Sequence, residues 1–324
     1  MRIGIVGAGA VGGLLGVSVA RQGHALSVLA RGATLAALRN AGWRIDRGGA
    51  RLDARVIASD SAGELGPQDI LIFAVKGPAL AAAAQAAQPM TGPQTVVVPA
   101  MNGVPWWFLL PGGGVLPPTA LKSIDPDGAI ARAIPFESVI GCVVHASAFT
   151  SAPGSVVHQS GNKLIFGEPS GGNSDRLASL VRLFHEAGFE TVHSRRIQRD
   201  IWYKLWGNMT MNPISAIAGA TCDRIINDEL VLAFVLRVMA EAAEIGKEIG
   251  CEIHESGKDR IAVARQLGVF KTSMLQDAEA GRPIEIDQLL TAPQEIAQLV
   301  AVPTPNLDAL LGLTRLYARG RGLY

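Results

Sequence analysis

The stretch IGIVGAGAVG, residues 3–12, decides the fold of this chain. It opens with a short β-branched run that ends at Gly7, and the segment from Val11 to Arg21 has a helical composition. The glycines therefore form a G-x-G-x-x-G pattern between a strand and a helix, where they permit a tight turn and close approach of the backbone to a pyrophosphate. We interpret this turn as a dinucleotide-binding site rather than a turn without a ligand. The residues expected to bind the cofactor here are Gly7, Ala8, Gly9, Ala10, Val11 and Gly12.

The rest of the first hundred residues continues this βαβ start. Further strand candidates are GHALSVLAR (23–31), RVIAS (55–59), DILIFAV (69–75) and TVVVPA (95–100). PALAAAAQAAQ (78–88) is a helix between the last two of them. Strands that alternate with helices form a parallel sheet, and right-handed connections place helices on both of its faces. The expected fold class is α/β, with an N-terminal Rossmann-type doubly wound sheet.

Residues 139–194 are expected to complete this first domain. Two apolar runs, 139–149 and 154–167, are separated by turn residues and predict a hairpin that extends the sheet. The next segment is an amphipathic helix with Ser174 or Asp175 as its N-cap, and residues 189–194 form a last short strand.

After Ser194 the strand signals vanish and apolar residues recur at helical spacing to the end of the chain. We therefore predict two domains, a dinucleotide-binding domain at residues 1–194 and an all-α substrate and catalytic domain at residues 195–324. Pro213 is expected to end or kink the first helix of the second domain.

The composition excludes several classes of function. Lys and Arg number 29 against 28 for Asp and Glu, which argues against a broad surface for nucleic acid. Apolar runs stay shorter than the roughly 18 residues of a membrane span, and the N-terminus has no signal-peptide pattern, so we expect a cytoplasmic protein without a membrane segment. The histidines lack metal-ligand spacing and we expect no metal. Three widely spaced cysteines suggest neither disulfides nor a zinc site: Cys142, Cys222 and Cys251.

Three side chains at the carboxyl ends of predicted strands point to the cofactor. Arg31 ends the second strand, where an NAD enzyme usually has an acidic residue, and an arginine there can pair with the 2′-phosphate of NADP. Lys76 and Asn102 follow two later strands, at the edge where open α/β sheets bind ligands. The sequence therefore favours NADP, although each of these residues could also be an ordinary turn residue.

The segment KLWGNMTMN, residues 204–212, carries a second polar cluster. Lys204, Asn208 and Asn212 are spaced four residues apart and share one stripe of a helix that is otherwise apolar. An amine and two amides in such surroundings need partners or a polar ligand, because burying them unpaired costs several kcal/mol. Ser273 and Glu285 lie further along and, taken alone, fit a helix cap and a solvated helix residue.

Together these motifs resemble the ketopantoate reductase (2-dehydropantoate 2-reductase) family over nearly the whole chain. The residues that carry the resemblance are GAGAVG at 7–12, Arg31, AVKG with Lys76, MNGV with Asn102, KLWGNMTMNPISAI at 204–217, and SMLQD at 273–277 followed by EID at 285–287. The spaced lysine and asparagines before a proline, and the later serine and glutamate, are more specific than the glycine pattern.

The resemblance implies NADPH-dependent reduction of a 2-keto acid to a 2-hydroxy acid in a cleft between the two domains, with 2-dehydropantoate (ketopantoate) as the leading substrate and pantothenate biosynthesis as the setting. It makes Lys204 the proton donor, with Asn208 and Asn212 on substrate oxygens. Ser273 would meet the substrate carboxylate, and Glu285 would orient the lysine and the cofactor. By the same resemblance Asn102 would lie near the nicotinamide ribose and the substrate, and Arg31 and Lys76 would bind the cofactor.

Two departures from the family pattern leave the substrate open. The loop at 104–118 contains Trp106 and Trp107, where the family has smaller residues, and these indoles could equally serve packing. A third asparagine expected after Asn212 is replaced by residues of the sequence TCD at 221–223. The alternatives are a paralogue that reduces another keto acid or ketone, an oxidative β-hydroxyacid-type dehydrogenase, and an NADP-binding redox sensor. A homodimer is also left open.

Overall fold

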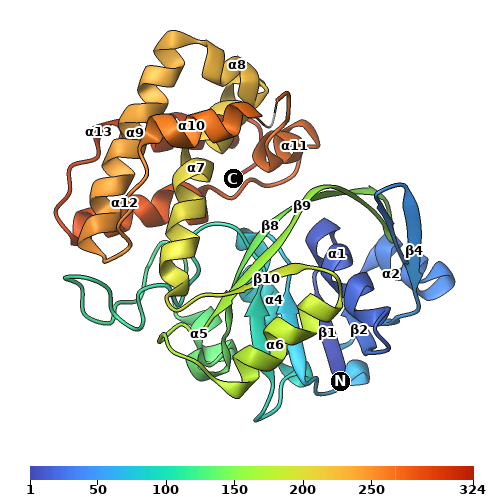
Figure 1. Ribbon diagram of the computed structural model, residues 1–324. Coiled ribbons are helices and arrows are strands. Elements are labelled where there is room, and N and C mark those ends of the chain that lie inside the picture. Colours follow the sequence, from blue (N-terminus) through green and yellow to red (C-terminus); the bar gives the residue numbers. More distant parts are fainter. Residues whose placement is uncertain (267) are drawn as a thin grey trace. The chain divides into compact units, whose positions relative to one another are not determined.

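The computed structural model describes residues 1–266 and 268–324, which form two compact units (Figure 1). Unit 1 comprises Met1–Met101 and Gly128–Ile197, and unit 2 comprises Asn102–Asp127 and Gln198–Tyr324. The expected single boundary after residue 194 therefore needs correction, because residues 102–127 pack with the helices.

Specific contacts hold residues 102–127 in unit 2. The backbone N–H of Val104 donates to the carbonyl of Gln288 at 2.9 Å, and the ring of Phe108 lies 6.0 Å from that of Trp202. The carboxylate of Glu295 accepts hydrogen bonds from the backbone N–H groups of residues 122 and 123, each at 2.9 Å. These partners come from the second half of the chain, so the local sequence could not reveal them.

The first sheet of unit 1 confirms the expected α/β fold. Its five strands are all parallel and are ordered β5-β2-β1-β6-β7. The strands are β1 (Arg2–Val6), β2 (Ala25–Leu29), β5 (Ile57–Ser59), β6 (Ile70–Phe73) and β7 (Val96–Pro99). The helical segments between them are α1 (Ala10–Ala20), α2 (Gly32–Ala41), α3 (Ala62–Leu65), η1 (Gly77–Ala79), α4 (Leu80–Ala86) and η2 (Gln88–Met90). The middle strands are apolar and almost fully buried, as a sheet covered on both faces requires.

The predicted hairpin is present, but it does not extend this sheet. β8 (Gly141–Ala152) and β9 (Ser155–Gly167) pair antiparallel, and the other edge of β9 pairs in parallel with β3 (Trp43–Arg47) and β10 (Glu190–His193). β4 (Ala50–Ala54) completes this second sheet. An isolated bridge between Val97 and Val139 joins the start of the hairpin to β7. The prediction was wrong in this respect because β3, β4 and β10 supply a separate set of strand edges.

The hairpin of β3 and β4 was missed from the sequence, although a signal is present. Gly48 and Gly49 connect the strands and both have positive φ, 57° and 80°. Two such residues between alternating buried and exposed positions are typical of a two-residue hairpin turn.

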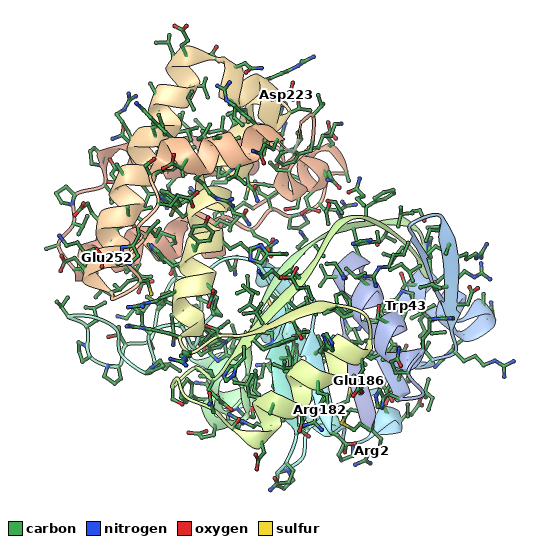
Figure 2. All side chains as sticks on the ribbon, in the orientation of Figure 1. Arg2, Trp43, Arg182, Glu186, Asp223 and Glu252 are labelled. Atoms are coloured by element: carbon green, nitrogen blue, oxygen red, sulfur yellow. The ribbon has the colours of Figure 1, made fainter. Side chains whose placement is uncertain are left out.

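Helix α1 lies between the two sheets and is held by a tryptophan. The indole of Trp43, on β3, is fully buried and is labelled in Figure 2. A Cβ atom at Gly13 would lie 2.8 Å from the Nε1 atom of Trp43, and one at Gly16 would lie 3.3 Å from both the indole and Ile5 of β1. The small residues of α1 thus allow both sheets to approach the helix that begins at the glycine turn.

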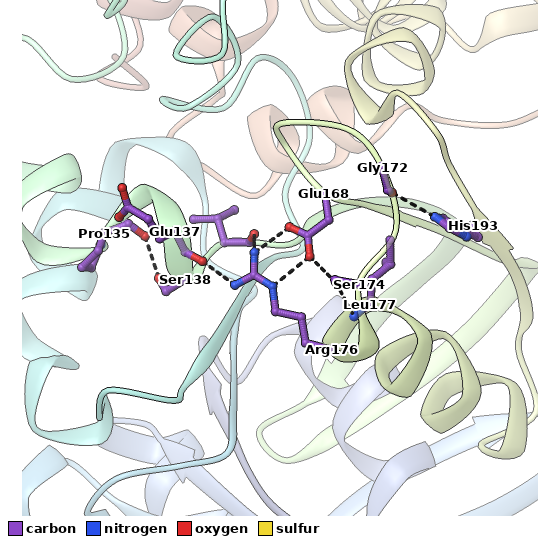
Figure 3. Close-up of polar contacts among 10 residues, drawn as sticks. Pro135, Glu137, Ser138, Glu168, Gly172, Ser174, Arg176, Leu177 and His193 are labelled. Atoms are coloured by element: carbon purple, nitrogen blue, oxygen red, sulfur yellow. Dashed lines mark hydrogen bonds and ion pairs between the residues drawn. The ribbon is translucent and has the colours of Figure 1, made fainter.

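The remaining helical segments of unit 1 are α5 (Ala129–Ala133), η3 (Phe136–Ser138) and α6 (Asp175–Glu186). Ser174 caps α6 by accepting a hydrogen bond from the N–H of Leu177, as one of the two expected caps. Figure 3 shows that Arg176 then joins two loops, because it donates to the carboxylate of Glu168, at 2.8 Å from Nε, and to the carbonyl of Glu137. It also donates to the carbonyl of Val139 at 3.3 Å. Burial raises the pKa of the Glu168 carboxyl, but the hydrogen bonds from Arg176 and Ser174 and the charge of Arg176 outweigh burial and hold that pKa below its usual range.

Unit 2 is built around the long helix α7 (Ile197–Ala218). The other helices are α8 (Cys222–Asn227), α9 (Glu229–Glu248), α10 (Gly257–Gln266), α11 (Ser273–Glu279), the π-helical turn η4 (Asp287–Thr291), α12 (Ala292–Leu299) and α13 (Pro305–Arg319). Figure 1 shows α9 beside α7, and the buried indoles of Trp202 and Trp206 donate to carbonyls of α9 at 3.0 and 2.8 Å. Pro213 lies inside α7, so it does not end the helix, and the alternative of a kink stays a prediction. None of the described helices is long and apolar enough to cross a membrane.

Candidate active site

The glycine turn of unit 1 combines crowded and open positions. Gly7 has φ of 105°, and a Cβ atom there would lie 2.6 Å from the carbonyl oxygen of Ala74. A Cβ atom at Gly12 would lie 2.2 Å from the carbonyl oxygen of Gly7, so neither position accepts a side chain. Gly9, the N-cap of α1, has nothing within 4 Å of its Cβ position and no side-chain cap. The backbone at the start of α1 is therefore open to a phosphate-sized anion, which fits a bound pyrophosphate.

Arg31 and Lys76 lie at the same edge of the first sheet as this turn. β2 and β6 flank β1 and run parallel to it, so their carboxyl ends meet at one edge. Arg31 follows β2 and is the N-cap of α2, and Lys76 follows β6 and precedes η1. Both side chains are exposed. The structure thus brings together the three expected elements of a dinucleotide site within unit 1.

The lysine of the helical stripe contacts a carboxamide in unit 2. The ammonium Nζ atom of Lys204 donates to the Oδ1 atom of Asn102 at 2.7 Å. Both residues are half-buried, and they come from α7 and from the turn after β7. Asn208 and Asn212 follow one and two turns along α7, half-buried and 7% exposed respectively. A cationic donor with fixed orientation and two neighbouring carboxamides is an arrangement that can protonate and hold a polar ligand.

A π-helical turn supports the asparagine from the far end of the chain. Gly103 packs on Gln288 of η4, since its Cβ position lies 2.5 Å from the carbonyl oxygen of Gln288, and the adjacent N–H of Val104 donates to that same oxygen. Glu285, which is 5% exposed, precedes η4 by two residues. π-helical turns inside helices are frequent at functional sites. Sequence reasoning missed Gln288, and no local signal marks it, because its role depends on a contact with a distant segment.

Ser273 has no hydrogen bond to Lys204 or Asn102 among the described residues. It is the first residue of α11 and is exposed. The cap of α11 is Thr272, whose hydroxyl accepts from the N–H of Leu275 at 3.1 Å. The hydroxyl of Ser273 is therefore not used as a helix cap.

Both departures from the family pattern contain residues that are buried in the structure. Trp106 and Trp107 are buried. Cys222 stands near the expected place of the third asparagine and is fully buried, and burial, with the charge of Asp223, raises the pKa of its thiol to about 12, so the thiol stays protonated and unreactive. Next to it, Thr221 Oγ1 and Asp223 Oδ1 are buried without a hydrogen-bond partner in the described part of the chain, and Figure 2 labels Asp223.

No group of three or more His, Cys, Asp or Glu residues able to hold a metal ion occurs among residues 1–266 and 268–324.

The glycine turn of unit 1 and the lysine of unit 2 together define the class of protein. A Rossmann-type unit with an open glycine turn, joined to a helical unit with a fixed lysine, is the architecture of a nicotinamide-dependent oxidoreductase.

Comparison with known proteins narrows this class to one family. The family description "Ketopantoate reductase PanE/ApbA" matches residues 3–107, and its C-terminal counterpart matches residues 196–318. A 2-dehydropantoate 2-reductase of Mesorhizobium japonicum is 43% identical over 100% of both chains. The chain belongs to the ketopantoate reductase family, which confirms the resemblance read from its motifs. Membership in this family implies a nicotinamide cofactor and a small-molecule substrate.

Solved structures agree on the fold. The crystal structure of a protein provisionally named a ketopantoate reductase from Ralstonia solanacearum MolK2 has a TM-score of 0.95 and 57% identity, and the match covers 100% of this chain and 99% of that one. D-Mandelate dehydrogenase, solved with NADH and anilino(oxo)acetate, has a TM-score of 0.84 with full coverage of both chains. At 20% identity the latter likeness shows the shared fold alone.

Proposed function

We propose that this protein uses NADPH to reduce a 2-keto acid to the 2-hydroxy acid, with 2-dehydropantoate as the favoured substrate and pantoate as the product. The observation that carries the proposal is the 2.7 Å hydrogen bond from Lys204 to Asn102, because it orients an ammonium donor next to the carboxamides of α7. The name of the Mesorhizobium relative supports the choice of substrate.

Unit 1 would hold the dinucleotide through the turn Gly7–Gly12. The open backbone at Gly9 would accept the pyrophosphate, and Arg31 would pair with the 2′-phosphate that distinguishes NADP from NAD. Lys76, at the neighbouring strand end, would add a second positive charge for the phosphates. Bound NADPH supplies the hydride that reduces the keto carbon.

Lys204 would act as the general acid. The keto oxygen gains negative charge as its carbon is reduced, and the ammonium stabilises this charge and donates a proton to the oxygen. The carboxamide oxygen of Asn102 holds the ammonium in place before that transfer. The resulting neutral amine regains its proton from water, which balances the cycle.

The neighbouring polar groups would position the substrate. Asn208 and Asn212 would donate to substrate oxygens, Ser273 would meet the carboxylate, and Glu285 would orient Lys204 and the cofactor. The burial of Asn212 supports its role, because a carboxamide at such a position needs a hydrogen-bond partner.

Reduction of a keto-acid panel tests the proposal directly. Loss of NADPH absorbance would be followed with 2-dehydropantoate and with branched and linear 2-keto acids, and the series would be repeated with NADH. We expect turnover with NADPH and the highest kcat/KM for 2-dehydropantoate. Fast turnover of another keto acid would indicate a paralogue, and NADPH binding without turnover of any of them would support a redox sensor instead.

Lys204→Ala tests the proton donor. Its kcat is expected to fall by about 10² to 10⁴, the range typical of a general acid. Lys247→Ala is the matched control, because Lys247 is an exposed lysine of α9 in the same unit. Equal kcat for the two variants would remove Lys204 from the mechanism.

Cytoplasmic localisation and a homodimer stay predictions.

A further inference from the structure

A cavity of about 340 Å³ lies within unit 2, between the ends of three helices. It is lined by residues 216–219 at the end of α7, by the second half of α11, and by Tyr317 and Arg321 at the end of α13. Alanines at positions 216, 218 and 278 leave the space between the helices open. The volume is within the usual range of small-molecule sites, about 300 to 1,000 Å³.

This cavity is separate from the proposed active site. The described residues that line it do not include Lys204, Asn208, Asn212 or Ser273. Ala216 follows Lys204 by about 18 Å along the axis of α7. A ligand of the cavity would therefore bind at the other end of the helix that carries the lysine.

The end of α7 offers hydrogen-bond acceptors to the cavity. The backbone carbonyls of residues 216–218 accept no hydrogen bond from the described residues, because the N–H of Ala220 donates to Ser215 instead. By contrast, the N–H groups of residues 280 and 320 bond back to the ends of α11 and α13. The last turn of α7 also has no basic side chain. Unpaired carbonyls at a helix end carry partial negative charge, so this part of the cavity favours a cationic donor.

Another wall of the cavity presents a positive charge. The guanidinium of Arg321 lies 4.4 Å from the ring centroid of Tyr317, one helical turn earlier, and no carboxylate pairs with it in the described part of the chain. The carboxylate of Glu279 also lines the cavity, but Lys271 donates to both of its oxygens, at 2.7 and 2.8 Å. The stacked guanidinium is therefore available to a carboxylate, to which it can donate two parallel hydrogen bonds.

We propose that this cavity binds a small amino acid with an apolar side chain. The ammonium group has three donors and no acceptor, which suits the unpaired carbonyls of α7. The carboxylate accepts hydrogen bonds from Arg321, and the apolar side chain packs on Leu275 and Ala278. A ligand that carries both charges is favoured because the cavity presents both a group of acceptors and a cation. The inference does not depend on the proposed reduction.

Isothermal titration calorimetry of the full chain with three probes tests the class of ligand. The probes are L-leucine, 4-methylpentanoate, which lacks the ammonium group, and 3-methylbutylamine, which lacks the carboxylate. We expect leucine to bind at least about 5-fold more tightly than either analogue, because each analogue loses one charged contact. Equal or tighter binding of an analogue would overturn the assignment to an amino acid, and a protein that does not bind leucine would overturn the site.

Variants of the cavity locate the binding site. Arg321→Gln should weaken leucine binding about 5-fold, and Ala278→Leu should abolish it by filling the cavity. Arg319→Gln is the matched control, because Arg319 is on the same helix but lies against Tyr324, at 5.6 Å, and does not line the cavity. Wild-type affinity for leucine in both cavity variants would overturn the proposal.

The same titration of Lys204→Ala separates the cavity from the proposed active site. This variant should bind leucine with wild-type affinity, whether or not the protein reduces a keto acid. Loss of leucine binding in Lys204→Ala would place the amino acid next to the lysine and would overturn the cavity as its site.

Discussion

Replacing Gly103 by alanine tests whether the turn that carries Asn102 is fixed by the π-helical turn. Gly103 has φ of 80°, and an added Cβ atom would lie 2.5 Å from the carbonyl oxygen and 2.6 Å from the Cβ atom of Gln288. Since such contacts are essentially never shorter than 3.0 Å, the turn has to move by at least 3.0 − 2.5 = 0.5 Å.

The expected loss of stability in Gly103→Ala has two parts. An alanine at positive φ costs about 1 to 2 kcal/mol, and loss of the bond from Val104 to Gln288 adds about 1 kcal/mol. We expect a fall of roughly 2 to 3 kcal/mol in the free energy of unfolding. The displacement also carries Asn102 away from Lys204, and because misplacement by about 1 Å can cost 10²-fold in rate, we expect kcat to fall about 10- to 100-fold.

Urea unfolding and steady-state NADPH oxidation would measure the two effects. Gly219→Ala is the control, because Gly219 also has positive φ, 61°, but nothing lies within 4 Å of its Cβ position. The control should lose stability through backbone strain alone and keep its kcat. If Gly103→Ala keeps wild-type kcat and is no less stable than Gly219→Ala, the support of Asn102 by Gln288 is refuted.

Two further predictions concern unit 1. Arg31→Ala should raise KM for NADPH about 10- to 100-fold and leave KM for NADH almost unchanged, because only NADPH has the 2′-phosphate. The control is Arg21→Ala, at the opposite end of α1, which should change neither KM. An equal change of KM for both cofactors in Arg31→Ala would contradict the pairing of Arg31 with the 2′-phosphate. In Glu168→Gln the free energy of unfolding should fall by about 1.5 to 3 kcal/mol at neutral pH through loss of the charged partner of Arg176. The folded-state pKa of Glu168 is lowered, so the stabilisation of the fold by its carboxylate is present above the unfolded-state pKa of about 4.5 and is lost as the pH falls below it. The difference in free energy of unfolding between Glu168→Gln and wild type should therefore shrink in acid. A difference that stays constant between neutral pH and pH about 3 would oppose this role of Glu168.

The sequence was informative where the structure depends on neighbouring residues. The strand, the turn Gly7–Gly12 and the helix after it follow one another directly, so the pattern predicted the fold class; the cofactor-binding role of the turn stays a prediction. The four-residue spacing of Lys204, Asn208 and Asn212 is also a local pattern, and it correctly predicted that they lie on one helix, α7. The hydrogen bond from Lys204 to Asn102 was not predicted, because it joins residues that are 102 positions apart.

What could not be predicted depends on distant segments. The separate second sheet requires β3 to pair with β9, and the assignment of residues 102–127 to the helical unit requires partners such as Gln288 and Glu295. Pro213 inside α7 shows the same limit, because a local rule against proline was outweighed by the packing of a long helix.

The discontinuous path of the chain has a consequence for its synthesis and for engineering. Three covalent connections, after residues 101, 127 and 197, join the two units. A fragment made of residues 195–324 would lack residues 102–127, which pack with the helices of unit 2. An exchange of unit 2 between relatives therefore requires two separate segments to be replaced rather than one. On the ribosome, residues 102–127 emerge long before Gln288 and Glu295 exist to receive them, and the helical unit cannot close until translation is nearly complete.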